Sequence, residues 1–162
     1  MSSQTMIAHE LAQLYARDLQ RLIQEIQAFP DTAALWQTAP GVSNAAGTLA
    51  LHLEGNLREF IGRQMGQIAF KRDRPLEFSA RGVERSELIA RLEAVRDSIP
   101  PVIARLTDAE LAGTHSEPYM DKPITRHQFL VHLNGHLNYH LGQIDYLRRF
   151  ATGNPAIDLA QM

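Results

Sequence analysis

Three histidines, His132, His136 and His140, recur at intervals of four residues in the stretch VHLNGHLNYHLGQIDYLRR. In a helix, four residues advance by about 400°, so each histidine lies one turn beyond the last and is rotated by about 40°. His140 falls inside the arc of the apolar residues, His136 about 20° beyond its edge and His132 about 60° beyond it. His136 and His140 are therefore the pair that can reach an interior, where two imidazoles at i and i+4 can bind one metal ion. The apolar arc consists of Phe129, Leu130, Leu133, Leu137, Leu141, Ile144 and Leu147.

A third ligand for such an ion has to come from another helix, and His52 is the best candidate that the sequence offers. It lies in a second helical stretch, at the edge of an apolar stripe formed by Leu49, Leu53 and Leu57. Asn56 and Glu59 follow it at i+4 and i+7 on the same edge. Either side chain could hydrogen-bond to the second ring nitrogen of His52 and fix its tautomer.

The same histidines also allow an interpretation without a metal. A histidine at the edge of an apolar stripe is more often a hydrogen-bonded packing residue than a ligand. Two neutral imidazoles buried together need partners for both ring nitrogens, which favours a metal without deciding the matter. His132 could support the site from its edge, although a solvated surface position is the simpler interpretation. No role is assigned to the other histidines, His9, His115 and His127.

Composition narrows the class of protein. The chain has 162 residues, of which 44% are hydrophobic and 21% charged, with a net charge of -2, which predicts one globular domain over residues 1–162. There is no cysteine, so a zinc–thiolate site and a protein thiol nucleophile are excluded, and any metal must be held by nitrogen and oxygen. The basic residues are scattered, which argues against nucleic-acid binding. Without a leader sequence or a long apolar run, we expect a soluble, cytoplasmic protein that does not enter membranes.

Apolar residues at helical spacing, N-cap residues and helix-breaking residues together predict an all-α protein with four long helices. Pro30 ends the first, Ser43 or Asn44 caps the second, and Thr125 with Gln128 forms a capping box before the fourth. Pro100 and Pro101 should kink or break the third helix. The polar connection 69–83 is long enough for a crossover, and TDAEL in the loop 107–124 predicts one helical turn. The predicted bundle helices span 5–29, 44–68, 84–106 and 125–150.

Other conspicuous side chains receive structural interpretations. Arg148 and Arg149 suit the negative end of the dipole of the last helix. Glu77 could pair with Arg72 or Arg74, but an exposed pair contributes little to stability. Packing is the default role for the aromatic residues Trp36, Tyr139 and Tyr146.

Three stretches of the chain resemble the DinB/YfiT-like metalloprotein superfamily: GTLALHLEGNLREFIGR, RDRPLEF and above all HLNGHLNYHLGQIDYLRR. The resemblance spans most of the chain. It implies a four-helix bundle of up-down-down-up topology, with the long crossover after the second helix, and commonly a homodimer. It also implies a divalent metal ion, zinc or nickel among the candidates, bound by His52, His136 and His140.

The resemblance leaves the activity open, because the superfamily includes thiol-dependent S-transferases and isomerases that use bacillithiol or mycothiol, and many members without known activity. One interpretation is a metal-dependent thiol S-transferase for small electrophiles, in which the ion activates a thiol cosubstrate. The alternative is a metal-binding stress or accessory protein without turnover, and a third is a packed bundle without metal. No catalytic side chain is assigned beyond the ligands.

Overall fold

The structure is a computed structural model that describes residues 6–117 and 121–158. Throughout these residues the regular secondary structure is helical, apart from an isolated bridge between Thr114 and Thr125, so the predicted all-α class is confirmed. Three short helices lie in the connections: α2 (Thr32–Leu35), α4 (Arg74–Ser79) and α6 (Asp108–Ala112). The long helices are α1 (Met6–Gln27), α3 (Ala46–Leu57), which continues into the π-helical turn η1 (Arg58–Arg63), α5 (Arg85–Ala104) and α7 (Arg126–Thr152).

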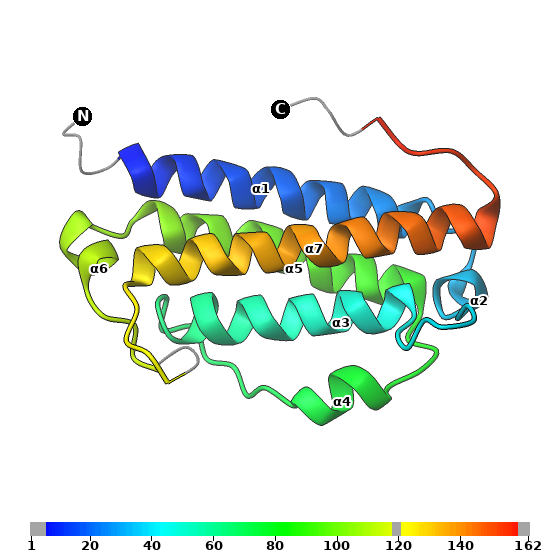
Figure 1. The fold of residues 1–162 in the computed structure, drawn as a ribbon, viewed down its shortest axis with the longest axis horizontal. Helices are drawn as coiled ribbons and strands as arrows, with labels where there is room; N and C mark the ends of the chain where they lie inside the picture. Colours follow the sequence, from blue (N-terminus) through cyan, green and yellow to red (C-terminus); the bar gives the residue numbers. More distant parts are fainter. Residues whose placement is uncertain (1–5, 118–120, 159–162) are drawn as a thin grey trace.

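The long helices lie side by side, and α4 lies outside them along α3 (Figure 1). Both α1 and α3 pack against α5 and against α7. Apolar side chains from all four fill the space between them, and each helix contributes fully buried residues such as Leu22, Leu53, Leu92 and Leu137. Such continuous burial is the main force that holds helices of this length together. None of the helices in the described ranges combines the length and the apolar character that crossing a bilayer requires.

Helix boundaries agree with the sequence prediction to within a few residues, with two exceptions in the second helix. Thr5, the predicted first residue of the first helix, lies outside the described residues. Helix α3 begins after Ala45 without a side-chain cap, so the predicted caps Ser43 and Asn44 are wrong. Helix α7 follows Thr125, as predicted, and ends at the left-handed Gly153. The Thr125 hydroxyl accepts the Gln128 N–H at 3.1 Å, which is the Thr125 half of the predicted capping box. The one-turn helix predicted for TDAEL is α6, with a capping box at Thr107.

The second predicted helix ends early. Its α-helical hydrogen bonding stops at Leu57, and the π-helical turn η1 ends at Arg63, five residues before the predicted end at 68. The chain leaves the helix at Gln67, which has a left-handed backbone (φ 55°), and the Ile68 N–H donates back to the Gly62 carbonyl at 2.9 Å. Packing against α5 is close here, because a Cβ atom at Gly66 would lie 2.6 Å from the Val102 side chain. Only a glycine can therefore pass α5 at this point without displacing it.

The predicted kink or break at Pro100 and Pro101 is not a break, because α5 continues through both prolines to Ala104. Each proline removes one backbone donor, which leaves the carbonyls of Arg96 and Asp97 without their helical partners. Arg96 is partly exposed and Asp97 exposed, so water can bind these two carbonyls. The apolar face of the helix, including Pro100 itself, stays buried in the core.

Polar side chains join α1 to α7 inside the core. The Tyr15 hydroxyl donates to the Leu130 carbonyl at 2.6 Å. The buried Asp18 carboxylate accepts hydrogen bonds from Asn134 at 3.2 Å and Asn138 at 2.7 Å. These contacts span the space between the first and last helices and satisfy groups that burial would otherwise penalise.

A buried ion pair completes this connection between α1 and α7. The Arg148 guanidinium binds the carboxylate of Glu25, and both residues are buried. It also binds Asp145 and the Pro155 carbonyl, each at 3.2 Å. The interpretation of Arg148 as a partner of the helix dipole alone is therefore incomplete, whereas Arg149 stays partly exposed and pairs with Asp145 at 3.6 Å.

Replacing Glu25 by alanine should lower the free energy of unfolding by about 3 kcal/mol, because it leaves the buried Arg148 guanidinium with only the more exposed Asp145 carboxylate as its counter-charge. Urea denaturation followed by circular dichroism measures the change. The double variant Glu25→Leu with Arg148→Met should regain most of the loss, since no buried charge remains. Arg149→Met is the matched control and should cost less than about 1 kcal/mol. A loss of similar size in Glu25→Ala and Arg149→Met would contradict the assignment.

Candidate metal centre

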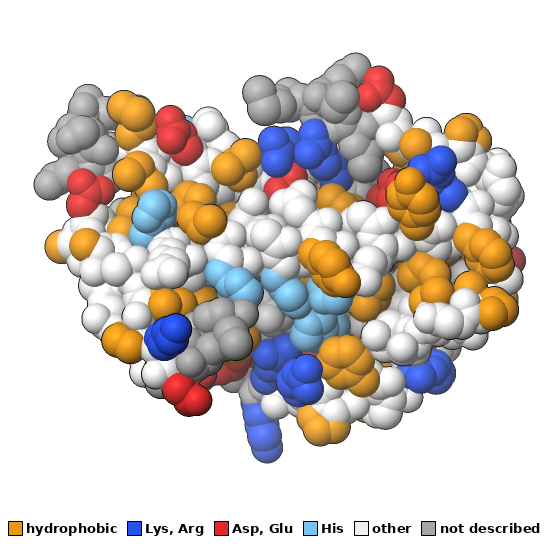
Figure 2. All heavy atoms as spheres, in the orientation of Figure 1, with side chains coloured by type: hydrophobic (Ala, Val, Ile, Leu, Met, Phe, Trp, Pro, Cys, Tyr) orange, Lys and Arg blue, Asp and Glu red, His pale blue; other side chains and the backbone are white. Residues whose placement is uncertain are grey.

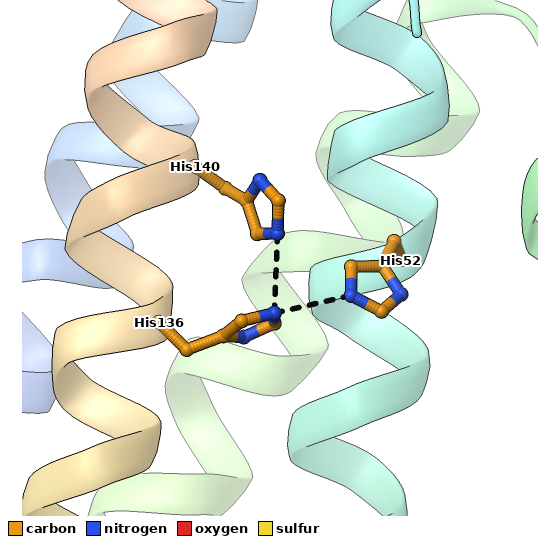
Figure 3. A group of neighbouring side chains, drawn as sticks. All are labelled: His52, His136 and His140. Carbon is orange, nitrogen blue, oxygen red and sulfur yellow. Dashed lines mark hydrogen bonds between the residues drawn. The ribbon is translucent and has the colours of Figure 1, made fainter. Parts of the chain in front are cut away.

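The three histidines that the sequence singled out as ligands meet between α3 and α7 (Figure 3). The His136 Nε2 atom lies 3.2 Å from His52 Nε2 and 3.1 Å from His140 Nε2. All three ligand atoms lie within 4.8 Å of one another. His52, on α3, is buried, whereas the pair on α7 is half-buried. The structure thus brings together His52, His136 and His140 and leaves His132 outside the group.

The spacing of the three nitrogens fits a single ion. Imidazole ligands bind zinc at about 2.0–2.1 Å, and tetrahedral angles at the ion then place neighbouring nitrogens about 3.4 Å apart. The two shorter separations, 3.1 and 3.2 Å, are close to this value. The third separation, between His52 and His140, is at most 4.8 Å, and binding one ion requires the rings to turn towards a common point. The cluster therefore has the donor type, the donor number and the spacing of a three-histidine site.

The second ring nitrogens of His52 and His140 fix the tautomers of both rings. His52 Nδ1 lies 3.0 Å from the Glu77 carboxylate, which can only accept, so this nitrogen carries the proton. His140 Nδ1 donates to Gln143 Oε1 at 2.6 Å. Both Nε2 atoms therefore present lone pairs, and both point at the same Nε2 of His136 (Figure 3). A neutral His136 can donate one proton to only one of them, so a shared cation satisfies the cluster better than hydrogen bonds can.

The surroundings favour the neutral form of these rings. Burial, followed by the effects of His140 and His52, lowers the pKa of His136 from the ordinary 6.5 to about 4. Burial also lowers the pKa of His140, although the hydrogen bond to Gln143 acts to raise it. Histidine binds metals in its neutral form. The ligand atoms are therefore ready for an ion at neutral pH.

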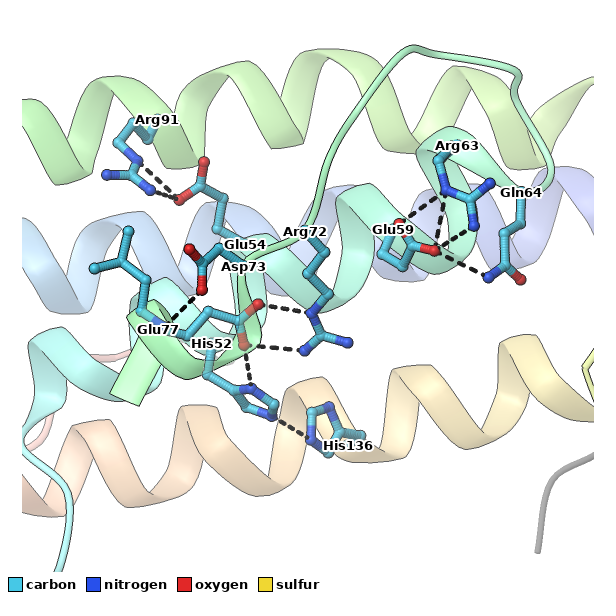
Figure 4. Close-up of polar contacts among 11 residues, drawn as sticks. His52, Glu54, Glu59, Arg63, Gln64, Arg72, Asp73, Glu77, Arg91 and His136 are labelled. Atoms are coloured by element: carbon cyan, nitrogen blue, oxygen red, sulfur yellow. Dashed lines mark hydrogen bonds and ion pairs between the residues drawn. The ribbon is translucent and has the colours of Figure 1, made fainter. Parts of the chain in front are cut away.

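Glu77 comes from the connection between α3 and α5, where it lies on the short helix α4 (Figure 4). Asp73 caps this helix by accepting the Leu76 N–H at 3.0 Å. The Glu77 carboxylate binds His52 and also Arg72, whose Nε and Nη2 donate at 2.6 and 3.0 Å. Burial raises the pKa of Glu77, but the hydrogen bonds from His52 and Arg72 outweigh it and hold the pKa below its ordinary value. The carboxylate stays ionised beside the ring that it orients.

A glycine on α3 makes room for this carboxylate. A Cβ atom at Gly55 would lie only 2.0 Å from Glu77 Oε1. Any larger residue at this position would push α4 or the carboxylate away from His52. The sequence thus provides both the orienting group and the space that it needs.

The orienting partner of His52 is not one of those predicted from the sequence. Glu59 instead binds Arg63 and Gln64 on its own helix (Figure 4). Asn56 is buried and lines a neighbouring cavity. Glu77 lies 25 residues beyond His52 in a polar connection, so no helical periodicity links the two. Its pair with Arg72 was predicted as exposed, but both partners are largely buried.

A cavity of about 390 Å³ adjoins the histidines. His52 and His136 form part of its wall, together with His132 and His115. His115, to which the sequence analysis assigned no role, is buried and stacks on the Phe129 ring at 4.0 Å. Figure 2 shows a group of histidine side chains at the surface of this face, with Lys and Arg side chains next to them. A second, larger cavity lies at a different site, and Leu49, Tyr146 and Phe150 form part of its wall.

Comparison with known proteins identifies the family and the fold. Residues 14–144 match a sequence model of the DinB superfamily. The crystal structure of a DinB-like protein from Bacillus cereus ATCC 10987 has a TM-score of 0.70 to this chain and 19% sequence identity. The similarity covers 91% of this chain and 93% of that one, and it shows that the two share a fold. Among functionally curated proteins there is no match.

Replacing Glu77 by glutamine should weaken divalent-metal binding about 10–100-fold, because the neutral amide orients His52 less firmly and makes its ring a weaker ligand. Competition with a chromophoric chelator measures the affinity. Glu59→Gln is the matched control: it removes an equal charge from α3–η1 but should leave the affinity unchanged. If Glu59→Gln weakens binding and Glu77→Gln does not, the assignment of Glu77 is wrong.

The metal-free protein should lose stability as the pH falls from about 6.5 towards 4. In this window the unfolded chain takes up a proton at His136, but the folded protein, with its pKa of about 4, does not. The stability that the neutral His136 contributes is fully present above about pH 6.5 and declines as the pH falls below this value. Urea denaturation at a series of pH values, with a chelator present, measures this slope. His136→Leu should make the slope shallower, and an unchanged slope would contradict the assignment.

Proposed function

This chain belongs to the DinB superfamily, and we propose on that basis that it binds one divalent metal ion through His52, His136 and His140 and acts as a thiol S-transferase on small electrophiles. The observation that carries the proposal is the convergence of the three Nε2 atoms, two of which are lone-pair donors fixed by Glu77 and Gln143. Imidazole donors suit zinc and nickel, which are the ions we propose.

His52, His136 and His140 would hold the divalent ion, which would supply Lewis-acid chemistry that makes a thiol anionic at neutral pH. The chain contains no cysteine, so the thiol comes from a small molecule. Its proton passes to solvent, the sulfur forms a bond to the electrophilic carbon, and the leaving group departs with its electron pair. The protein holds the rings in their neutral tautomers, and Glu77 keeps His52 aligned through the reaction.

The alternative is a metal-binding stress or accessory protein without turnover. The cavity beside the histidines favours the enzyme, because a site for a substrate needs a concave space lined by both polar and apolar groups. A protein that only stores or senses an ion has no need of such a space.

The finer architecture belongs to the same proposal. We propose the up-down-down-up topology of the superfamily, and Figure 1 supports it, since α1 and α7 run in one direction and α3 and α5 in the other. We also propose a cytoplasmic homodimer. Exposed apolar side chains on α7 support an association surface: Val131, Tyr139, Tyr146 and Phe150.

Replacing His140 by alanine should remove most of the bound metal, since two ligands remain, while helical circular dichroism stays largely intact because the leucine core is unchanged. Elemental analysis of protein loaded with zinc or nickel measures the content. His132→Ala is the matched control on the same helix and should retain the metal. Loss of metal in His132→Ala with retention in His140→Ala would contradict the ligand set.

The transferase assignment is tested with 1-chloro-2,4-dinitrobenzene and several low-molecular-weight thiols. Transfer forms a carbon–sulfur bond and releases chloride, and the product is followed by absorbance. Metal-loaded protein should accelerate the reaction with at least one thiol, and His140→Ala should abolish the acceleration. Full metal occupancy without acceleration for this and other electrophiles would favour the non-catalytic alternative.

A further inference from the structure

The cavity beside the histidines contains unpaired polar groups. Asn56 Oδ1, His115 Nε2 and His136 Nδ1 are buried, and none of them has a hydrogen-bond partner among the described residues. All three residues line this one cavity. A buried polar group without a partner costs about 1–3 kcal/mol. Asn56 and His115 are more than nine-tenths buried, so a polar partner for their unpaired atoms has to lie inside the cavity and not at the protein surface.

The charges around the cavity are mostly positive. Arg72 and Arg74 line it, together with the single acid Glu117. Arg72 is engaged by the Glu77 carboxylate. Arg74 forms no ion pair with another described residue, and its guanidinium instead lies over the Phe78 ring, 5.0 Å from the ring centroid. A cation of this kind, next to a site for a divalent ion, selects an anionic ligand.

The position of Arg74 limits the size of that ligand. The Phe78 ring that it covers lies 4.9 Å from the His52 ring, so the guanidinium is within about 10 Å of the metal-binding imidazole, a range over which charges interact. A sulfur at the ion lies about 2.3 Å from it, and an ion pair spans up to about 4 Å. With the guanidinium within about 10 Å of the His52 ring, a thiol whose sulfur and carboxylate are separated by a short carbon chain is of the right order of length to reach both ends.

The remaining walls are aromatic. Phe60 and Phe129 meet edge to face at 5.2 Å, and His115 stacks on Phe129. These rings offer an apolar surface to the carbon skeleton of a ligand, whereas the unpaired nitrogens of His136 and His115 can donate to its oxygens. Polar and apolar groups thus face one space.

We propose that this cavity binds the thiol cosubstrate and selects a thiol that carries a carboxylate, with its sulfur at the three histidines and its carboxylate at Arg74. The inference rests on the proposed metal-dependent thiol chemistry. It adds to that function the class of thiol and a specificity-determining residue, Arg74. Arg74 lines the cavity and lies on α4, the same short helix that supplies Glu77.

Cobalt(II)-loaded protein provides a test that does not depend on turnover. A thiolate that binds cobalt produces a charge-transfer absorption band, so titration gives an affinity for each thiol. The probes are 3-mercaptopropionate, which is anionic, 2-mercaptoethanol, which is neutral, and cysteamine, which is cationic. We expect the ratio of the affinities for 3-mercaptopropionate and cysteamine to fall about tenfold in Arg74→Gln, equivalent to 1.4 kcal/mol. Comparing ratios between proteins cancels the different basicities of the thiols.

Two further variants make the result specific. Arg74→Lys keeps the charge and should keep most of the ratio. Lys71→Gln removes a cation from the same connection, but Lys71 lines a different cavity, so the ratio should equal that of the unaltered protein. The cobalt d–d absorption and circular dichroism confirm that site and fold are intact in each variant.

The outcomes separate this inference from the function on which it rests. Charge-transfer bands with an unchanged ratio in Arg74→Gln would overturn the role of Arg74 and leave the thiol chemistry standing, with water as the partner of the buried polar groups. Bound cobalt without a band for any thiol would remove both proposals. If propionate competes as well as 3-mercaptopropionate, the carboxylate and not the sulfur is at the metal, which also overturns the inference.

Discussion

Three imidazole nitrogens point at one small volume, and most of the architecture around them serves to hold them there. Two of the nitrogens sit on consecutive turns of α7, but the third belongs to α3 and reaches them only if the two helices keep a fixed separation and register. Packing of leucines such as Leu53 and Leu137 fixes the separation. Glu77 and Gln143 then fix the rotation of the rings, so the lone pairs converge without help from the ligand they would bind.

The parts of this arrangement that follow from local periodicity were predictable from the sequence. The 3.6-residue repeat places His136 and His140 on the inner side of α7 and leaves His132 outside the cluster, because all three share one helix. Glu77 was not predictable in this way. Its contact with His52 crosses from a connection to a helix, and its burial depends on the missing side chain of Gly55. His115 was not predictable in this way either, because its ring stacks on Phe129 of α7 and its backbone N–H donates to the Ile124 carbonyl at 2.8 Å.

Two other expectations were incomplete, because local rules were applied where tertiary contacts decide. Pro100 and Pro101 do not break α5, because the apolar side of the helix stays packed and neither Arg96 nor Asp97, whose carbonyls lose their helical partners, is a buried residue. Arg148 was placed at a helix end by its position in the chain, but its partner is Glu25, on the first helix. A signal was present: Asp18 and Glu25 fall on the apolar face of α1, beside Leu22 and Ile26, where a charged group requires a partner.

The contacts between α1 and α7 impose an order on the assembly of the chain. The residues joined by the Glu25–Arg148 pair are 123 positions apart, and those joined by the Tyr15 and Asp18 contacts are 115 to 120 apart. At a synthesis rate of about 5–20 residues per second, the groups on α1 wait roughly 6–25 s on the ribosome before their partners are made. During this interval water must solvate them, so α1 cannot reach its final buried position. The helix that closes the core is therefore translated after the other three long helices, and it is the same helix that carries His136 and His140.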